Sequence, residues 1–282
     1  MSIAFLMRSL QRLLVVGVGI LSIWLIVFVV FRITENRLPW ILALAATYGI
    51  GAYVILPRAV RISLKILQHK HIPRYTITGD GLPGDPVNLV LIGTRQQLHA
   101  AFAAAGWLTA DRLSLASSWR MAQTFITNSP YPTAPFSTLY LFGRGQDIGF
   151  QKAIGDSPRK RHHVRFWGKS LAHLPAGPDT ASFWLNTDRP AARERVLWAG
   201  AATKDTGLGL TRLTFQITHA TDSDTNAERD VVVAALKGAG KIGEVTLAEA
   251  GAPLGHVNHY VSDGEVAVAQ LTIKDPALAA PP

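Results

Sequence analysis

Two uncharged runs dominate the pattern of hydrophobic and polar positions near the N-terminus. Residues 13–31 (LLVVGVGILSIWLIVFVVF) and residues 38–56 (LPWILALAATYGIGAYVIL) contain no Asp, Glu, Lys or Arg. Each run is long enough to cross a hydrocarbon core of about 30 Å as a helix, and each is apolar on every face. The short connection 32–37 forces an antiparallel return. The pattern therefore predicts a two-helix transmembrane hairpin, in preference to a buried soluble hairpin or a cleaved signal sequence.

The pattern breaks after this hairpin. Residues 78–86 (TGDGLPGDP) are dense in glycine, proline and aspartate, a composition that interrupts helices and central strands. We therefore expect a membrane anchor over residues 1–75 with a basic juxtamembrane segment, a linker over 76–86, and a soluble domain over 87–282.

The soluble domain mixes both kinds of periodicity. Helices are predicted over 95–107, ending at Gly106, over about 110–127, and over 226–240, where Thr225 and Glu228 have capping-box spacing. Short runs rich in β-branched and aromatic residues predict strands at 87–94, 136–143, 147–154, 162–168, 181–187, 195–203, 213–220 and 265–273. Together they predict an α+β fold, a mostly antiparallel mixed α/β domain with helices over one face of the sheet.

Charge is divided unevenly along the chain. Of the net +9, residues 1–75 contribute nine basic side chains against one acid, whereas the remainder is close to neutral. This distribution argues against a nucleic-acid partner, which would require the excess on the folded domain. Basic residues flank the outer ends of the two runs more densely than the connection, so the positive-inside rule predicts that both termini are cytoplasmic. A chain without cysteine has no disulfides and no thiolate chemistry.

The segment KRHHVRFWGK, residues 160–169, concentrates charge and aromatic surface. If it is a strand, its side chains alternate between the core and an outer row, the first set being His162, Val164 and Phe166 and the second His163, Arg165 and Trp167. A row of this kind can receive an anion such as phosphate, because arginine presents a fixed fork of donors. The alternative is an ordinary exposed strand face on which Arg165 stacks on Trp167.

Two further groups of polar residues are candidate sites. His219 is followed by Asp222, Asp224 and Asp230, which are either ligands of a divalent metal or helix-capping residues. Arg144 and Asp147 lie among glycines between two predicted strands, where a hairpin turn with a local ion pair is the ordinary explanation, and Asp205 follows a strand. Neither a phosphate-binding loop nor a nucleophile elbow occurs in the sequence.

A series of blocks in a fixed order resembles the LssY C-terminal domain family. The blocks are GDPVNLVLIGT, AGW, YPTAPFSTLYLFGRGQDIGFQK, RHHVRFW, WAGAAT, THATDSDTNAERD and YVSDGEVAVAQL, spanning about residues 80–275. In relatives this domain often accompanies membrane modules, including phosphatidic-acid-phosphatase-like and DedA-like segments, whereas here it follows only the hairpin. The resemblance implies no established catalytic activity that carries over to this chain. It marks Arg144, Asp147, His162, His163, Arg165, His219, Asp222, Asp224 and Asp230 as candidate site or framework positions.

Two functions are compatible with these features. One is a protein of the bacterial inner (cytoplasmic) membrane whose soluble domain binds an anionic ligand, either a lipid headgroup or an envelope polymer, with candidate contacts at Arg144, Asp147, His163, Arg165 and Asp205. The other is a metal-dependent hydrolase of a phosphoester, with a divalent metal on His219, Asp222 and Asp224 and with His163 or Asp205 as acid or base. The sequence predicts a lipid bilayer as partner in both cases.

Overall fold

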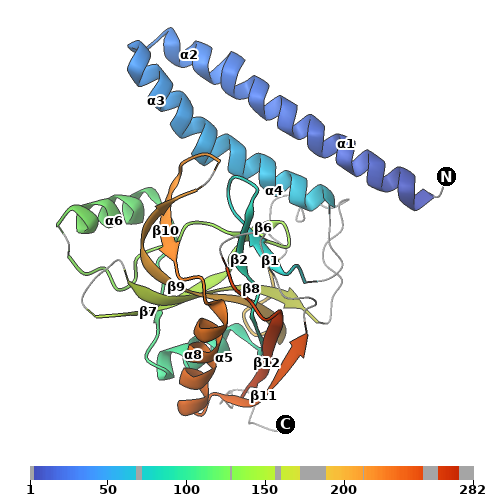
Figure 1. The fold of residues 1–282 in the computed structure, drawn as a ribbon, viewed down its shortest axis with the longest axis vertical. Coiled ribbons are helices and arrows are strands. Elements are labelled where there is room, and N and C mark those ends of the chain that lie inside the picture. Colours follow the sequence, from blue (N-terminus) through green and yellow to red (C-terminus); the bar gives the residue numbers. More distant parts are fainter. Residues whose placement is uncertain are drawn as a thin grey trace.

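The N-terminal region of the computed structural model is a hairpin of two long helices (Figure 1). The first runs through α1 (Ile3–Trp24), the π-helical η1 (Leu25–Val30) and α2 (Phe31–Glu35), and the second through α3 (Trp40–Ile50), η2 (Gly51–Ile55) and α4 (Leu56–Leu67). The structure describes residues 3–67, 72–127, 129–155, 160–171, 189–211, 213–249 and 260–272.

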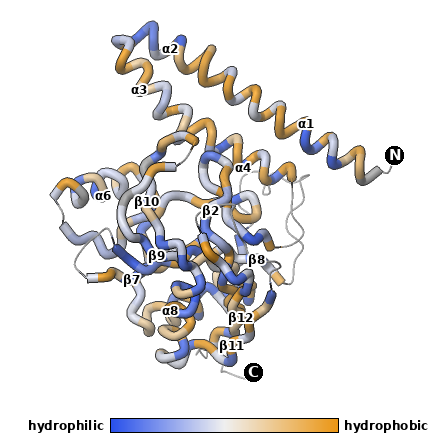
Figure 2. Tube along the Cα trace, in the orientation of Figure 1, coloured by the Kyte–Doolittle hydropathy of each residue, from blue (hydrophilic) through white to orange (hydrophobic). Residues whose placement is uncertain are grey.

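The hairpin confirms the two apolar helices that the sequence predicts. Phe5–Glu35 and Trp40–Leu67 are each long and apolar enough to cross a membrane, and hydrophobic positions dominate both (Figure 2). Near the turn, the hydroxyls of Thr34 and Thr47 lie 2.9 Å apart and join the two helices. Both helices extend beyond the uncharged runs, because the basic residues at their outer ends do not interrupt helical hydrogen bonding.

An eight-stranded sheet forms the centre of the soluble domain. Its strand order is β11-β12-β3-β9-β8-β7-β4, with β10 paired to β9, and among these described strand pairs only β12–β3 is parallel. The strands are β3 (Leu89–Gly93), β4 (Leu108–Thr109), β7 (Ile148–Ala153), β8 (Arg161–Ser170), β9 (Val196–Leu210), β10 (Ile217–Thr221), β11 (Ile242–Glu249) and β12 (Glu265–Leu271). The mixed, mostly antiparallel fold is therefore confirmed. The strand predicted at 181–187 lies outside the described residues, and β11 was not predicted.

Helices α5 (Arg95–Ala104) and α8 (Thr225–Gly238) pack on one face of this sheet. Phe102 from α5 stacks on Phe150 from β7 with ring centroids 4.2 Å apart. Gly106 follows α5 with a φ of 77°, which glycine adopts without steric cost. The residue that caps α8 is Asp224, and not the predicted Thr225, because the Asp224 carboxylate accepts hydrogen bonds from the first free amides of the helix.

A smaller sheet covers the other face. Its order is β2-β1-β5-β6, from β1 (Tyr75–Ile77), β2 (Pro83–Pro86), β5 (Tyr140–Leu141) and β6 (Arg144–Gly145), and its side chains pack on Trp167 and Ala199 of the large sheet. Residues 76–86, predicted as a linker, thus belong to a hairpin. The prolines are tolerated because β2 is an edge strand, and Gly81 turns the chain with a φ of 85°.

Candidate functional site

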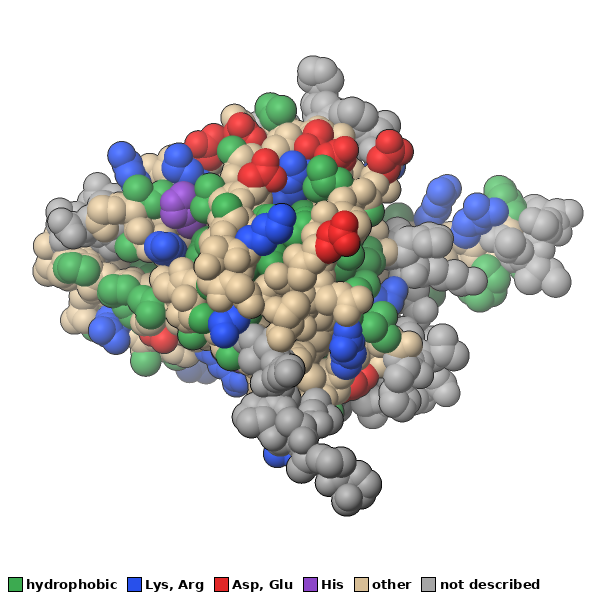
Figure 3. Space-filling view, turned by 90° about the horizontal axis from the view of Figure 1, so that it is seen from below, with side chains coloured by type: hydrophobic (Ala, Val, Ile, Leu, Met, Phe, Trp, Pro, Cys, Tyr) green, Lys and Arg blue, Asp and Glu red, His purple; other side chains and the backbone are tan. Residues whose placement is uncertain are grey.

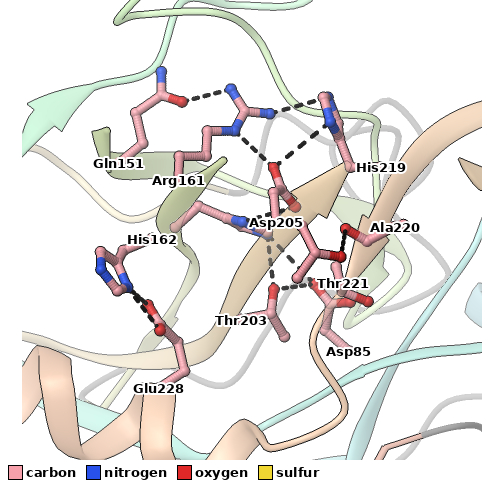
Figure 4. Close-up of polar contacts among 12 residues, drawn as sticks. Asp85, Gln151, Arg161, His162, Thr203, Asp205, His219, Ala220, Thr221 and Glu228 are labelled. Atoms are coloured by element: carbon pink, nitrogen blue, oxygen red, sulfur yellow. Dashed lines mark hydrogen bonds and ion pairs between the residues drawn. The ribbon is translucent and has the colours of Figure 1, made fainter. Parts of the chain in front are cut away.

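A row of polar side chains lies buried on the face of β8 that the small sheet covers. Arg161, His163 and Arg165 alternate along β8, and the antiparallel register sets Arg161 opposite Asp205 and His163 opposite Thr203 on β9. All five residues are buried, His163 and Thr203 completely. Together with Asp85, Gln151, His219 and Tyr260 they form what we term the buried polar network, most of which is drawn in Figure 4.

Asp85 connects β2 to this network. Its Oδ2 accepts a hydrogen bond from Arg165 Nη1 at 2.5 Å, and its Oδ1 accepts one from Tyr260 Oη at 2.7 Å. Burial alone would raise the pKa of the Asp85 carboxyl, but the charge of Arg165 and the contacts with His163 outweigh burial, so the pKa lies below 3.8. Asp85 is therefore ionised at neutral pH and binds the small sheet to the large one.

Arg161 lies at the other end of the buried polar network. Its Nε donates to Asp205 Oδ2 at 2.7 Å, its Nη1 to Gln151 Oε1 at 2.6 Å, and its Nη2 lies 3.1 Å from His219 Nε2. Burial lowers the pKa of His219 to about 4, although the Asp205 charge opposes the change. His219 is therefore neutral at pH 7, with Nε2 accepting from Arg161. Its side chain keeps 16% of its surface exposed, which makes it the outer edge of the network.

His163 lies at the centre, between the two carboxylates. Its Nε2 accepts from Arg165 Nη1 at 2.6 Å and lies 2.8 Å from Thr203 Oγ1, which assigns the ring proton to Nδ1. Nδ1 is 3.2 Å from Asp205 Oδ1, out of line for a hydrogen bond. Burial would raise the pKa of Asp205, but His163, His219 and Arg161 together hold it far below its ordinary value.

The network has the components of a proton relay without access to a substrate. Thr203, His163 and Asp205 place a hydroxyl, an imidazole and a carboxylate in sequence, as in hydrolytic triads. Neither Thr203 nor His163 has exposed surface, so no ligand reaches the hydroxyl in this conformation. Two guanidinium groups also face two carboxylates, which leaves the network without excess charge to attract an anion. The predicted open row of His163 and Arg165 is therefore a closed, internally paired one.

Arg144 and Asp147 form a separate group. Arg144 Nη2 lies 3.0 Å from Asp147 Oδ2 and also donates to the carbonyl of Gly168, while Asp147 accepts from the Gly168 amide at 2.8 Å. Arg189 adds a second cation, with its Nε 3.3 Å from Asp147 Oδ1. This arrangement joins the β6–β7 turn to β8 and matches the ordinary explanation of a local ion pair.

The predicted metal ligands do not assemble. Asp222 forms a half-exposed pair with Lys204 at 3.5 Å, Asp224 caps α8, and Asp230 pairs with Arg229 at 3.0 Å, whereas His219 faces Arg161. Within the residues that the structure describes, no three His, Asp or Glu side chains are placed to share a metal ion. The capping alternative therefore holds for Asp224. His162, the remaining family position, contacts Glu228 of α8 at 2.8 Å.

Several members of the buried polar network were not predicted from the sequence. Arg161 lies two residues before His163, and Thr203 two residues before Asp205, so each is on the same face of its strand as the predicted residue. Extending the alternation by two positions identifies both. Asp85 and Tyr260 lie far from β8 in sequence and meet it only through the fold, so no local signal points to them.

Comparison with known proteins gives one match. The family model described as LssY C-terminus matches residues 69–266, a range that includes every member of the buried polar network. No curated protein and no solved structure matches the chain.

Proposed function

We propose that this chain, which belongs to the LssY C-terminus family, is a membrane-anchored protein whose soluble domain binds an anionic lipid at the membrane surface. The two N-terminal helices would hold the domain against the bilayer. The ligand would be an amphiphile with an acyl chain and a negatively charged headgroup. An envelope polymer would share the charge but lack the acyl chain.

A groove on the large sheet carries this proposal. It has a volume of about 510 Å³ and is lined mainly by aliphatic side chains of β3, β9 and β12, among them Val90, Val266 and Val268. Arg74 and Lys169 add two cations to its wall, with Glu249 as the one acid among the described lining residues. An apolar cleft of several hundred Å³ with a few charged groups is typical of sites for small amphipathic ligands.

Part of the wall of the groove comes from the segment that follows the membrane anchor in the sequence. Residues 72–74 line it, and they follow α4 after a few residues. Arg58 and Arg61 of α4 are at the same end of the hairpin as Arg12 of α1, because α1 and α4 run antiparallel along each other (Figure 1). Positive charge at this end supports a cytoplasmic location of both termini and of the soluble domain, at the inner membrane of a bacterium.

The buried polar network has a supporting role in this proposal. Arg165 and Asp205, predicted as ligand contacts, are neutralised by Asp85 and Arg161, and Arg144 is neutralised by Asp147. We assign these residues to the framework that joins the small sheet to the large one. The alternative, a metal-dependent hydrolase of a phosphoester, needs His219, Asp222 and Asp224 to share a metal ion, and their observed contacts with Arg161, Lys204 and the N-terminus of α8 favour the lipid-binding proposal.

Lipid retention by the purified protein tests the proposal. The full chain is extracted in a mild detergent, and native mass spectrometry then measures the lipid that remains bound. We expect one anionic lipid per chain in the wild type and its loss in Val268→Trp, because the indole would fill the groove. Replacing both Arg74 and Lys169 with glutamine should weaken retention and remove the preference for anionic over zwitterionic lipid.

Matched controls separate the groove from general effects. Leu247→Trp adds the same ring to the neighbouring β11 at an exposed position outside the groove, and Lys237→Gln with Lys241→Gln removes two charges near the end of α8. Both controls should retain lipid like the wild type. Equal retention in Val268→Trp and the wild type, or binding of a polymer without an acyl chain, would disprove the groove as a lipid site.

A further inference from the structure

The turn between β9 and β10 exposes large apolar side chains. Leu210, Leu213 and Phe215, which lie at this turn, are 59%, 61% and 66% exposed. Phe215 also has a φ of 53°, a left-handed conformation that bulky residues rarely adopt. The turn is held by hydrogen bonds from the Thr211 amide to the Gln216 carbonyl and from the Phe215 amide to the Thr211 carbonyl. Strain of this kind is retained where the surrounding structure or a function requires it.

This turn contacts the second long helix within its apolar run. Tyr48 Oη donates to the Thr214 carbonyl at 2.7 Å, and Gln216 Nε2 donates to the Ala52 carbonyl at 2.6 Å. At 1.5 Å per residue, Ala52 and Tyr48 lie about 6 Å and about 12 Å along the helix from Leu56, where the uncharged run ends. If that run spans a bilayer, the turn lies below the membrane surface and not above it.

Helix α6 (Leu115–Thr127) presents a second apolar surface. Leu115, Trp119, Ala122 and Ile126 follow one another at helical spacing, and Leu115, Trp119 and Ile126 are 93%, 68% and 83% exposed. Among described residues after Leu67, these three and Phe215 are the most exposed large hydrophobic side chains. An outward-facing apolar stripe on a helix is characteristic of helices that lie in the membrane interface.

The two surfaces lie on the same side of the domain. In Figure 1, α6 and the β9–β10 turn are in the part of the domain toward α3, whereas α8 and β11 are at the opposite end. Viewed from that opposite end, acidic and basic side chains are scattered over the surface (Figure 3). The most exposed large apolar side chains among the described residues of the domain thus belong to α6 and the β9–β10 turn, which lie toward the helical hairpin.

We propose that the β9–β10 turn and α6 insert into the leaflet next to the soluble domain, as a second membrane contact beside the two spans. The inference rests on the proposed membrane anchoring. The partner of this apolar surface is the bilayer, because the turn is hydrogen-bonded to the second helix inside the apolar run. These bonds hold the turn at membrane depth. The strained Phe215 and the stripe of α6 would then face acyl chains and not water.

The absence of cysteine makes a direct test possible. Single cysteines replace Leu213, Leu115, Ile20 in the first helix, and Val231 on α8, and each is labelled with an environment-sensitive fluorophore in full-length protein reconstituted into phosphatidylglycerol–phosphatidylcholine vesicles. We expect nitroxide-labelled lipid to quench the probes at 213, 115 and 20, and aqueous iodide to quench only the probe at 231.

The position in the first helix separates the two proposals. Lipid quenching at 20 but not at 213 and 115 would overturn the inserted surface and leave the membrane anchoring intact. Loss of lipid quenching at 20 would instead disprove the anchoring. Probes at 213 and 115 that neither quencher reaches would indicate a protein partner or a second copy of the chain, which also contradicts insertion.

Discussion

Arg161 on β8 and Asp205 on β9 face each other across the antiparallel ladder and form an ion pair of 2.7 Å whose side chains are 5% and 1% exposed. A pair this deeply buried stabilises the fold only while both partners are present. The guanidinium also contacts Gln151 and His219, so that three strands besides its own depend on it.

Asp205→Asn is therefore expected to destabilise the protein strongly. Removing one carboxylate leaves Arg161 charged and buried, at a cost of roughly 3–5 kcal/mol in the free energy of unfolding. Thermal or denaturant unfolding of the full chain in detergent measures the change. Asp222→Asn is the matched control, because its partner Lys204 is exposed and such pairs contribute about 0–1 kcal/mol. Equal effects of the two substitutions would contradict the burial of the pair.

Stability should also fall on mild acidification. The folded pKa of His219 is about 4, below its ordinary 6.5, so between these values the unfolded chain binds the proton and the folded one does not. Stability is complete above pH 6.5 and decreases toward pH 4, by at most about 1.4 kcal/mol per pH unit. Asp85 and Asp205, with lowered pKa values, add a further loss only below about pH 3.8.

The variant His219→Gln isolates this effect, since glutamine keeps an acceptor for Arg161 but does not titrate. Denaturant midpoints at pH 7.5, 6 and 5 should decline less steeply in the variant than in the wild type. Parallel slopes would show that another group controls the acid sensitivity.

The fold was predictable where a local pattern decides the outcome. The uncharged runs identify both long helices, and β-branched alternation identifies most strands, including β8. The same alternation could not show that both faces of β8 are buried. That depends on the small sheet, whose strands β1 and β2 arise from a segment with the composition of a linker. Asp85 lies in that segment. Because the segment was predicted as a linker, the sequence did not identify Asp85 as the partner of Arg165.

The candidate site was harder to predict, because burial and pairing are long-range properties. His163 and Arg165 have the residue types of an anion site, but Asp85 from a distant strand neutralises Arg165, and Asp205 lies 3.2 Å from His163. The groove gave no signal in the sequence, because its aliphatic lining has the same composition as core strands.

Contact between the soluble domain and α4 should depend on Gly143. This glycine has a φ of 70°, and a Cβ there would lie 2.7 Å from Lys65 Cγ on α4. Gly143→Ala should therefore raise backbone strain and push α4 away, with faster amide exchange in α4 and the β5–β6 turn. Gly155→Ala is the control, since its φ of 65° is similar but nothing lies within 4 Å. It should show only the backbone cost of a left-handed L-residue, roughly 1–2 kcal/mol. Similar exchange in α4 for both variants would refute the contact.

The side of the membrane on which the domain lies can be tested by thiol labelling. Arg12, Arg58 and Arg61 are at one end of the hairpin and Arg32 and Arg37 at the other, where Glu35 offsets part of the charge. With Lys65 and Arg74 also at the first end, the positive-inside rule predicts that the turn near Asn36 faces away from the cytoplasm. In intact cells, a membrane-impermeant maleimide should label Asn36→Cys but not Lys241→Cys, and permeabilised cells should label both. Labelling of Lys241→Cys in intact cells would place the domain outside, and the anionic lipid of the proposed groove would then have to come from the outer leaflet.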